Sequence, residues 1–314
     1  MKKISFLLVS TLFLLGGCQS MFGDDRGGHV EDLNVEEPLE TGEGTVEDDQ
    51  YTSVNEYTGE GYRLNGGEAN DKIAQEKFDE IEASVKAFFL EKYKTEVIVH
   101  NAVGNKDGAT VFVESEGKPH FHTSAIVPIN SEAEEVRTDG IWTLEKEVEK
   151  SIATGMLAMV MEEEFAKLNS YLEAFVSENN LTGLRKEAIE NVKATSYTTP
   201  YYFVQAHGES RDSLVELYLK DPTSDRKAIA QQFNKETYDY KEVSFSINLY
   251  VKSEEIDPEE SLLESLVKDI EQLEGIPRGR YSVSIHGNEI NKRTATAPDD
   301  HTLRKGNPDY IRKD

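Results

Sequence analysis

The chain of 314 residues contains a single cysteine, Cys18. It can therefore form neither an intramolecular disulfide nor a zinc site built from several cysteines. An exported protein without disulfides depends on its apolar core for stability. A lone thiol would be an odd reactive group in a secreted domain, and its position close to Met1 indicates a different role.

Basic residues are also scarce. The sequence has 34 Lys and Arg against 60 Asp and Glu, a formal net charge of -26. Such a surface repels the phosphates of nucleic acids, so we exclude nucleic acid as a partner. Anionic lipid headgroups repel it equally, so membrane attachment through a basic patch is not expected and another anchor is required.

Long apolar runs are absent as well. The largely apolar run from Ile4 to Leu15 has 12 residues, whereas a membrane-spanning helix needs about 20. It follows Lys2 and Lys3 and has the proportions of the central region of a signal peptide. No second apolar run approaches 18 residues, so we expect no transmembrane helix after it.

The four residues that end this region, Leu15-Gly16-Gly17-Cys18, resemble the lipobox of bacterial lipoproteins. The resemblance implies that residues 1–17 are a removable signal peptide and that Cys18 carries a thioether-linked diacylglycerol. The protein would then be lipid-anchored in the cell membrane, on its extracytoplasmic face. Two acyl chains give stable anchoring where one does not. The alternative is an ordinary signal peptide with an incidental cysteine. It does not explain why two lysines, a short apolar run and a lipobox-like segment occur together.

Residues 18–50 have the composition of a flexible acidic linker. From residue 19 they contain eleven acidic residues, one arginine and five glycines. Like charges repel one another and extend such a chain. We interpret the segment as a spacer that holds a folded body away from the membrane, and low-affinity cation binding is the alternative.

Hydrophobic periodicity predicts an α+β body over residues 51–290. Long amphipathic helices are expected to pack on an antiparallel β-meander. The predicted helices cover about 70–94, 144–176, 184–192, 224–234 and 257–275. The predicted strands cover 97–103, 110–115, 121–129, 201–206, 243–251 and 280–286, and segment 212–219 fits either type.

Three boundaries of this body depend on weaker signals. Gly155 lies inside the long helix and argues against its being continuous. An internal boundary near 178–199 would give two subdomains, and a single continuous body is the alternative. Residues 291–314 contain prolines, charges and few apolar side chains, so we predict a mobile C-terminal tail.

His120 and His122 are the candidate metal ligands. They flank Phe121 on a predicted strand, where residues two apart face the same side and two imidazoles can reach one ion. A zinc site needs at least one further ligand, and no spacing in the sequence nominates one. The plainer alternative is a pair of solvent-facing histidines on a half-exposed strand.

Other chemistry-bearing residues have plainer explanations. Three consecutive glutamates, 162–164, fan around a helix and cannot converge on one ion. His207 and Ser210 combine base and nucleophile types but lack the strand-to-helix elbow of a serine hydrolase. No dinucleotide fingerprint, phosphate-binding loop or His-Glu-x-x-His is present. We therefore expect no cofactor and assign no catalytic residue.

Four segments together resemble a known family. They are the lipobox, Tyr57–Tyr62 after the acidic linker, Gly117–His122 and Thr198–Phe203. The chain resembles a family of uncharacterised lipoproteins of low-GC Gram-positive bacteria, known only as a domain of unknown function, over about residues 51–290. The resemblance implies a location and a shared fold, and it provides no catalytic residues.

The leading functional hypothesis is a non-enzymatic, membrane-tethered protein that binds an unidentified envelope protein or polymer. An envelope hydrolase, metal-assisted through His120 and His122, is the alternative. A third hypothesis, a solute-binding lipoprotein, requires two lobes around a cleft. The predicted order of helices and meander argues against that arrangement.

Overall fold

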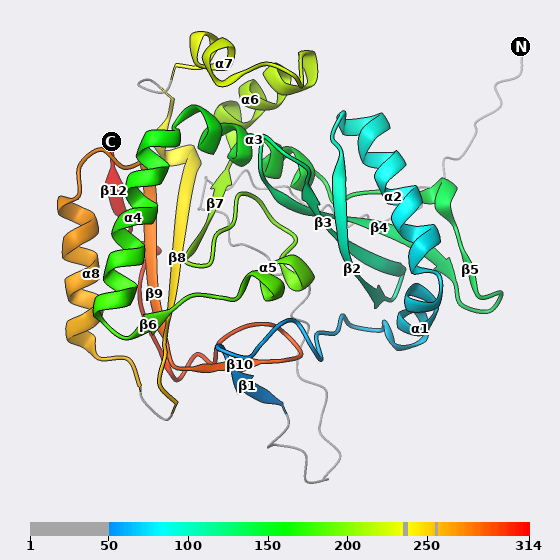
Figure 1. Cartoon of the computed structure of the whole chain (residues 1–314), viewed down its shortest axis with the longest axis horizontal. Coiled ribbons are helices and arrows are strands. Elements are labelled where there is room, and N and C mark those ends of the chain that lie inside the picture. Colours follow the sequence, from blue (N-terminus) through cyan, green and yellow to red (C-terminus); the bar gives the residue numbers. More distant parts are fainter. Residues whose placement is uncertain (1–49, 235–237, 255–256) are drawn as a thin grey trace, which may run out of the picture. The chain divides into compact units, whose positions relative to one another are not determined.

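The computed structural model describes residues 50–234, 238–254 and 257–314 (Figure 1). The signal peptide 1–17, Cys18 and, apart from Gln50, the linker 18–50 lie outside the described residues, so their roles stay predictions. Across the described part of the chain, no helix combines the length and apolar character needed to cross a membrane.

The first sheet is the predicted antiparallel meander, in the order β2-β3-β4-β5. Its strands are β2 Val97–Asn105, β3 Gly108–Ser115, β4 His122–Asn130 and β5 Glu135–Val136. The three predicted strands are confirmed. The short β5, which pairs with the end of β4, was not predicted.

Two helices pack on this sheet where the periodicity predicts one. They are α1 Glu68–Glu76 and α2 Phe78–Tyr93, and the chain bends between them at Lys77. The bend lets α2 lie on the sheet while α1 reaches the edge of β2. There Asn70 and Gln75 donate hydrogen bonds to backbone carbonyls of β2. Covering the backbone groups of an edge strand in this way prevents pairing with other chains.

The central helix is α3 Glu147–Val160, followed by α4 Glu162–Glu178. Ten of the 14 residues of α3 are buried, because it packs against β4 of the first sheet and β7 of the second (Figure 1). An α-helix that is apolar all round is a core helix. The predicted single helix over 144–176 is therefore interrupted, but at Met161 and not at Gly155.

The second sheet is mixed. Its strands are β6 Leu181–Thr182, β7 Tyr202–Ala206, β8 Val243–Val251, β9 Gly279–His286, β11 Thr302–Lys305 and β12 Ile311–Lys313. At its centre β8 runs parallel to β9, and all other pairs are antiparallel. Helix α8, Glu260–Gln272, makes the crossover that a parallel pair requires. The α+β class is confirmed, with one parallel pair added to the antiparallel prediction.

Two local predictions on this side of the molecule need correction. The ambiguous segment 212–219 is helical, within α6 Gly208–Lys220, and α7 Arg226–Gln232 follows as expected. Helix α8 begins at Glu260, later than the predicted start at Asp257. The carboxylate of Asp257 instead pairs with His301, 2.5 Å away, so it does not cap the helix.

The segment 291–314 differs from the predicted mobile tail. It contains β11 and β12, which both pair with β9, and the side chain of Ile311 is 4% exposed. Two short strands bound mainly through their backbones leave little periodicity in a sequence. The unpaired edge of β9 supplies the partner that the sequence alone cannot show.

A second, smaller core lies beside the two sheets, where the boundary near 178–199 was considered. Helix α5, Lys186–Val192, contributes Ala188 and Val192 to this core, and β10 Glu289–Asn291, which pairs with β1 Tyr51–Ser53, contributes Ile290. Its buried residues are Val54, Tyr57, Ala188, Val192, Tyr250, Ile290 and Ala295. This core joins segments from both ends of the body, so no subdomain boundary is seen in this stretch.

Candidate metal centre

Three metal-ligand side chains converge at the turn between β3 and β4. They are Glu114, His120 and His122, whose ligand atoms all lie within 4.8 Å of one another. Glu114 is the cross-strand partner of His122, and its Oε1 is 3.4 Å from Nδ1 of His120. The ring centroids of the two histidines are 5.3 Å apart. The structure thus brings the two predicted histidines together and adds the carboxylate that the sequence did not nominate.

A fourth side chain, His100, reaches the same carboxylate from β2. Its Nε2 lies 2.8 Å from Oε2 of Glu114. The register between β2 and β3 shifts at this point, because His100 is the extra residue between Val99 and Asn101. A β-bulge of this kind re-aims a side chain and is common next to functional sites.

Helix α5 contributes Glu190, whose carboxylate forms a second group with His100 and Glu114. The neighbouring Asn191 fixes the helix against the sheet: its carbonyl accepts from the side chain of Asn101, and its own amide donates to the carbonyl of Thr58. The small core described above holds the other face of α5. Glu190 therefore has a defined place beside the sheet.

His120 is positioned by contacts to its backbone. The hydroxyl of Ser115 donates to the carbonyl of Pro119 and accepts from the N–H of Phe121, which ties both ends of the His120 peptide to β3. Gly155 of α3 lies against the His120 carbonyl, so closely that a Cβ there would stand 2.6 Å from the oxygen. This close approach explains a glycine inside a continuous helix.

A short segment between α5 and β7 closes the other side of the site. The carbonyl of Ser196 accepts from the N–H of His122, and the ring of Tyr197 stands edge-on to the ring of His120. Ser151 and Thr154 of α3 hold this segment, since their hydroxyls accept from the N–H groups of Ser196 and Tyr197. The site is thus built on the central helix as well as on the sheet.

The protonation states suit a metal ion. Burial lowers the pKa of His122 to about 4 and also lowers the pKa of His120. The hydrogen bond from His100 is the main cause that lowers the pKa of Glu114 to about 2. At neutral pH the two imidazoles are therefore neutral and the carboxylate is ionised, the forms in which these side chains bind metals.

One buried nitrogen of this site, Nδ1 of His122, has no partner among the described residues. His122 is 4% exposed, and its Nδ1 makes no hydrogen bond to any of the described residues. Buried polar atoms are nearly always hydrogen-bonded, and an exception calls for an explanation such as an ion or a water molecule. The donor set of two imidazoles and one carboxylate is one that Zn²⁺ accepts. The residues present therefore fit a divalent ion.

The remaining candidates from the sequence do not form sites. Glu162 pairs with Lys118 and Arg226 and Glu163 with Arg226, so both lie on the predicted solvated face. The N–H of Ser210 donates to the side chain of Glu242 at the start of α6. His286 is buried in the second sheet, where its ring nitrogens hydrogen-bond to Thr302 and Asn248.

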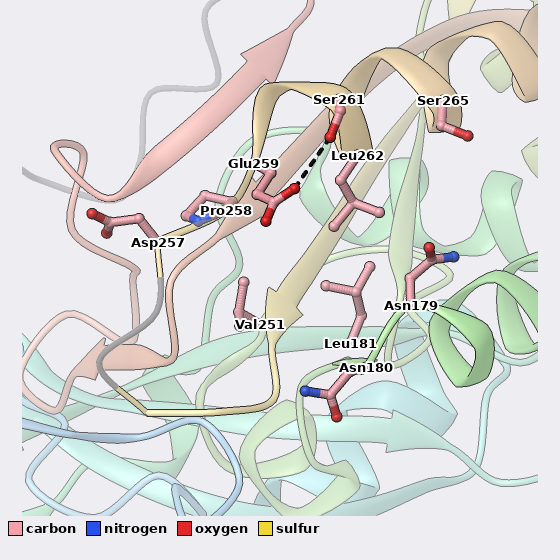
Figure 2. Close-up of a pocket in the computed structure, with 10 residues that line it drawn as sticks. All are labelled: Asn179, Asn180, Leu181, Val251, Asp257, Pro258, Glu259, Ser261, Leu262 and Ser265. Atoms are coloured by element: carbon pink, nitrogen blue, oxygen red, sulfur yellow. Dashed lines mark hydrogen bonds between the residues drawn. The ribbon is translucent and has the colours of Figure 1, made fainter.

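A shallow hollow of about 360 Å³ lies between the start of α8 and the connection from α4 to β6 (Figure 2). Its polar lining is already engaged: Ser261 donates to Glu259, Asn179 donates to Phe175 and Asn180 donates to Ser253. The hollow contains no imidazole and is open to solvent. It is not the deep cleft that the solute-binding hypothesis requires.

Part of the missed ligand set had a signal in the sequence. The turn at Gly117–Pro119 is centred on Lys118, so a regular hairpin places Glu114 opposite His122, as observed. The symmetry of the hairpin about Lys118 is therefore a sequence signal for Glu114 as the third ligand. The position of His100 depends on the bulge in β2, and the position of Glu190 depends on the packing of α5. No local sequence pattern predicts either position.

Comparisons with known proteins support the fold and provide no activity. Residues 44–313 match the family described as "Protein of unknown function (DUF1672)". The structure is similar to the crystal structure of a DUF1672 family protein from Staphylococcus aureus, with a TM-score of 0.66 and 17% sequence identity, covering 84% of this chain and 98% of that chain. At that identity the likeness shows the fold alone. No curated protein matches the chain.

Proposed function

The chain belongs to the DUF1672 family, whose function is unknown, and from that premise we propose that it is a metal-binding lipoprotein of the cell envelope. Its body binds one divalent transition-metal ion, of which Zn²⁺ is the best fit, through Glu114, His120 and His122. Cys18 anchors it to the membrane, on the extracytoplasmic face.

The observation that carries the metal proposal is the convergence of Glu114, His120 and His122, together with the buried Nδ1 of His122 that has no partner among the described residues. Neutral imidazoles and a carboxylate together are typical of zinc sites. Supporting groups fix each ligand: His100 hydrogen-bonds to Glu114, Ser115 holds the loop of His120, and Ser196 holds the backbone of His122. Such outer contacts orient the ligands and raise metal affinity.

The anchor proposal rests on the sequence, namely the basic start, the apolar run and the box that ends at Cys18. It gives the metal site a place outside the cytoplasm. The test is fractionation of wild type and Cys18→Ala. The wild type should sediment with membranes and the variant should not, and a variant that stays wholly membrane-bound would refute the lipid anchor.

The metal proposal is tested by elemental analysis of the purified full chain and by zinc titration after removal of metal with a chelator. We expect bound zinc, and a loss of affinity of more than about 100-fold in His122→Asn. His301→Asn is the matched control, because His301 is an exposed histidine that belongs to neither ligand group. A chain that takes up no divalent ion, or equal binding by His122→Asn and wild type, would refute the proposal.

Zinc should also stabilise the fold, because an ion that binds only the folded state adds to its stability. Free zinc at 100 times its Kd raises the free energy of unfolding by about 2.7 kcal/mol. Chemical denaturation with and without zinc measures this shift. The shift should be smaller in His122→Asn and persist in full in His301→Asn.

A second candidate function, a metal-assisted hydrolase, is favoured by the exposure of one ligand. The side chain of His120 is 38% exposed, so the site opens to solvent on that side. Three protein ligands with one open position are the arrangement of catalytic zinc sites, where the fourth position holds a water molecule. Zinc-dependent cleavage of a chromogenic ester or phosphoester, abolished in His122→Asn, would support it; zinc binding without cleavage favours a binding role.

A further inference from the structure

The ligand set around Glu114 is larger than one ion needs. Five side chains form two groups of three, Glu114-His120-His122 and His100-Glu114-Glu190, and Glu114 belongs to both. We propose that the site binds two divalent metal ions, bridged by the carboxylate of Glu114. This inference rests on the proposed function, since it adds a second ion to the same site.

The two oxygens of Glu114 already face different groups. Oε1 lies 3.4 Å from Nδ1 of His120, whereas Oε2 lies 2.8 Å from Nε2 of His100. A carboxylate that offers one oxygen to each side is suited to bridging two ions about 3.5–4 Å apart, the separation found in two-metal sites. The first ion takes the two histidines of the turn, and the second takes His100 and Glu190.

The second group is accessible and can rearrange. The side chains of His100, Glu114 and Glu190 are 15%, 13% and 17% exposed, so they lie at the edge of the body, not deep in it. Glu190 is paired with Lys186, whose side chain is 75% exposed. Because the Lys186 ammonium is largely exposed, it can return to water when an ion takes its place beside Glu190.

The chemistry of the two groups differs. Two imidazoles and one carboxylate favour Zn²⁺ at the first position, whereas one imidazole and two carboxylates make a harder set that also suits Mn²⁺. Two divalent ions carry a charge of +4, and the two glutamates neutralise half of it. The pair therefore leaves positive charge to attract a hydroxide or an anionic ligand such as a phosphoryl or carboxylate group.

The experiment is a stoichiometry measurement on the purified, metal-free full chain titrated with Zn²⁺, and with Mn²⁺ followed by electron paramagnetic resonance. Wild type should bind two equivalents of zinc. Glu190→Gln should bind one, held by the histidines of the turn, and His122→Asn should also bind one, at the other position. Glu187→Gln is the matched control: Glu187 lies on the same helix, is exposed, and belongs to neither ligand group, so its variant should bind two.

A single equivalent in wild type that is lost in His122→Asn but unchanged in Glu190→Gln would overturn the second ion and leave the proposed function standing. The absence of a bound ion in wild type and in every variant would overturn the proposed function itself. If Glu190→Gln fails to fold, the Mn²⁺ spectrum of wild type decides. An exchange-coupled signal at two equivalents supports the pair, and two equivalents with uncoupled signals overturn the bridge.

Discussion

Gly155 and His120 are in backbone contact although they are 35 positions apart in the chain (155 minus 120). A Cβ on Gly155 would stand 2.6 Å from the carbonyl oxygen of His120 and 3.1 Å from its carbonyl carbon. These are backbone atoms, which cannot swing aside as a flexible side chain can. The central helix and the turn that contains His120 therefore determine each other's positions.

The first prediction concerns Gly155→Ala. At an exposed helix position this change would stabilise by about 1 kcal/mol. Here the clash with His120 outweighs that gain, and we expect a net loss of about 1–3 kcal/mol in the free energy of unfolding together with about tenfold weaker zinc binding. Ala158→Gly on the same helix is the control: it should also lower stability, by roughly 1 kcal/mol, without changing zinc affinity. Equal affinity in wild type and Gly155→Ala would contradict the positioning role.

The second prediction concerns Thr154, which supplies the hydrogen-bond acceptor for the N–H of Tyr197 at 2.8 Å. Thr154→Val keeps the shape of the side chain and leaves that N–H unpaired. We expect a loss of about 1–3 kcal/mol in the free energy of unfolding, measured by urea denaturation. Thr294→Val changes an exposed hydroxyl and should cost less than about 0.5 kcal/mol. Similar losses in the two variants would show that the hydroxyl of Thr154 has no special role.

The third prediction concerns pH. Burial is the main cause that lowers the pKa of His286 to about 4; Arg304 and Lys193 lower it further, and Asp299 opposes them. Between pH 6.5 and pH 4, His286 is protonated in the unfolded chain but stays neutral in the folded protein. This contribution to stability is therefore complete above pH 6.5 and falls by at most about 1.4 kcal/mol per unit as the pH drops to 4.

Replacing His286 by Gln should make the stability curve flatter over that window, as measured by denaturation at several pH values. His301→Gln is the control, because Asp257 raises the pKa of His301 and its contribution changes only above pH 6.5. The prediction fails if His286→Gln and wild type have the same slope between pH 6.5 and pH 4.

The fourth prediction tests the packing of the last strand. Ile311 of β12 is 4% exposed and sits opposite Tyr281 of β9. Ile311→Ala should lower the free energy of unfolding by about 2–5 kcal/mol. Arg312→Ala, at the exposed neighbouring position, should change it by less than about 0.5 kcal/mol. If Ile311→Ala is as stable as wild type, residues 291–314 are the loosely attached tail that their composition suggests.

The sequence predicted those elements whose periodicity is set by one buried face. The alternation of Val243, Phe245 and Ile247 placed β8 correctly, and turn residues placed the meander. The sequence predicted the structure less well where contacts between distant residues determine where an element begins or ends. The break in the long helix follows from how α3 and α4 pack, and β11 and β12 exist because β9 offers an edge.

The site shows the same division. His120 and His122 were recognisable because a strand places residues two apart on one side. Glu114 follows from the symmetry of a regular hairpin about Lys118, which is visible in the sequence. His100 and Glu190 come from a bulge and from a helix fixed by a separate small core, and both depend on contacts between residues far apart in the chain.

The burial of α3 between the two sheets has a mechanical consequence. A helix that belongs to the cores on both sides leaves no hinge about which two halves could close on a guest, since any opening would expose its apolar surface on one side. An ion that binds as proposed would therefore meet a preformed site, without closure of two halves of the body around it.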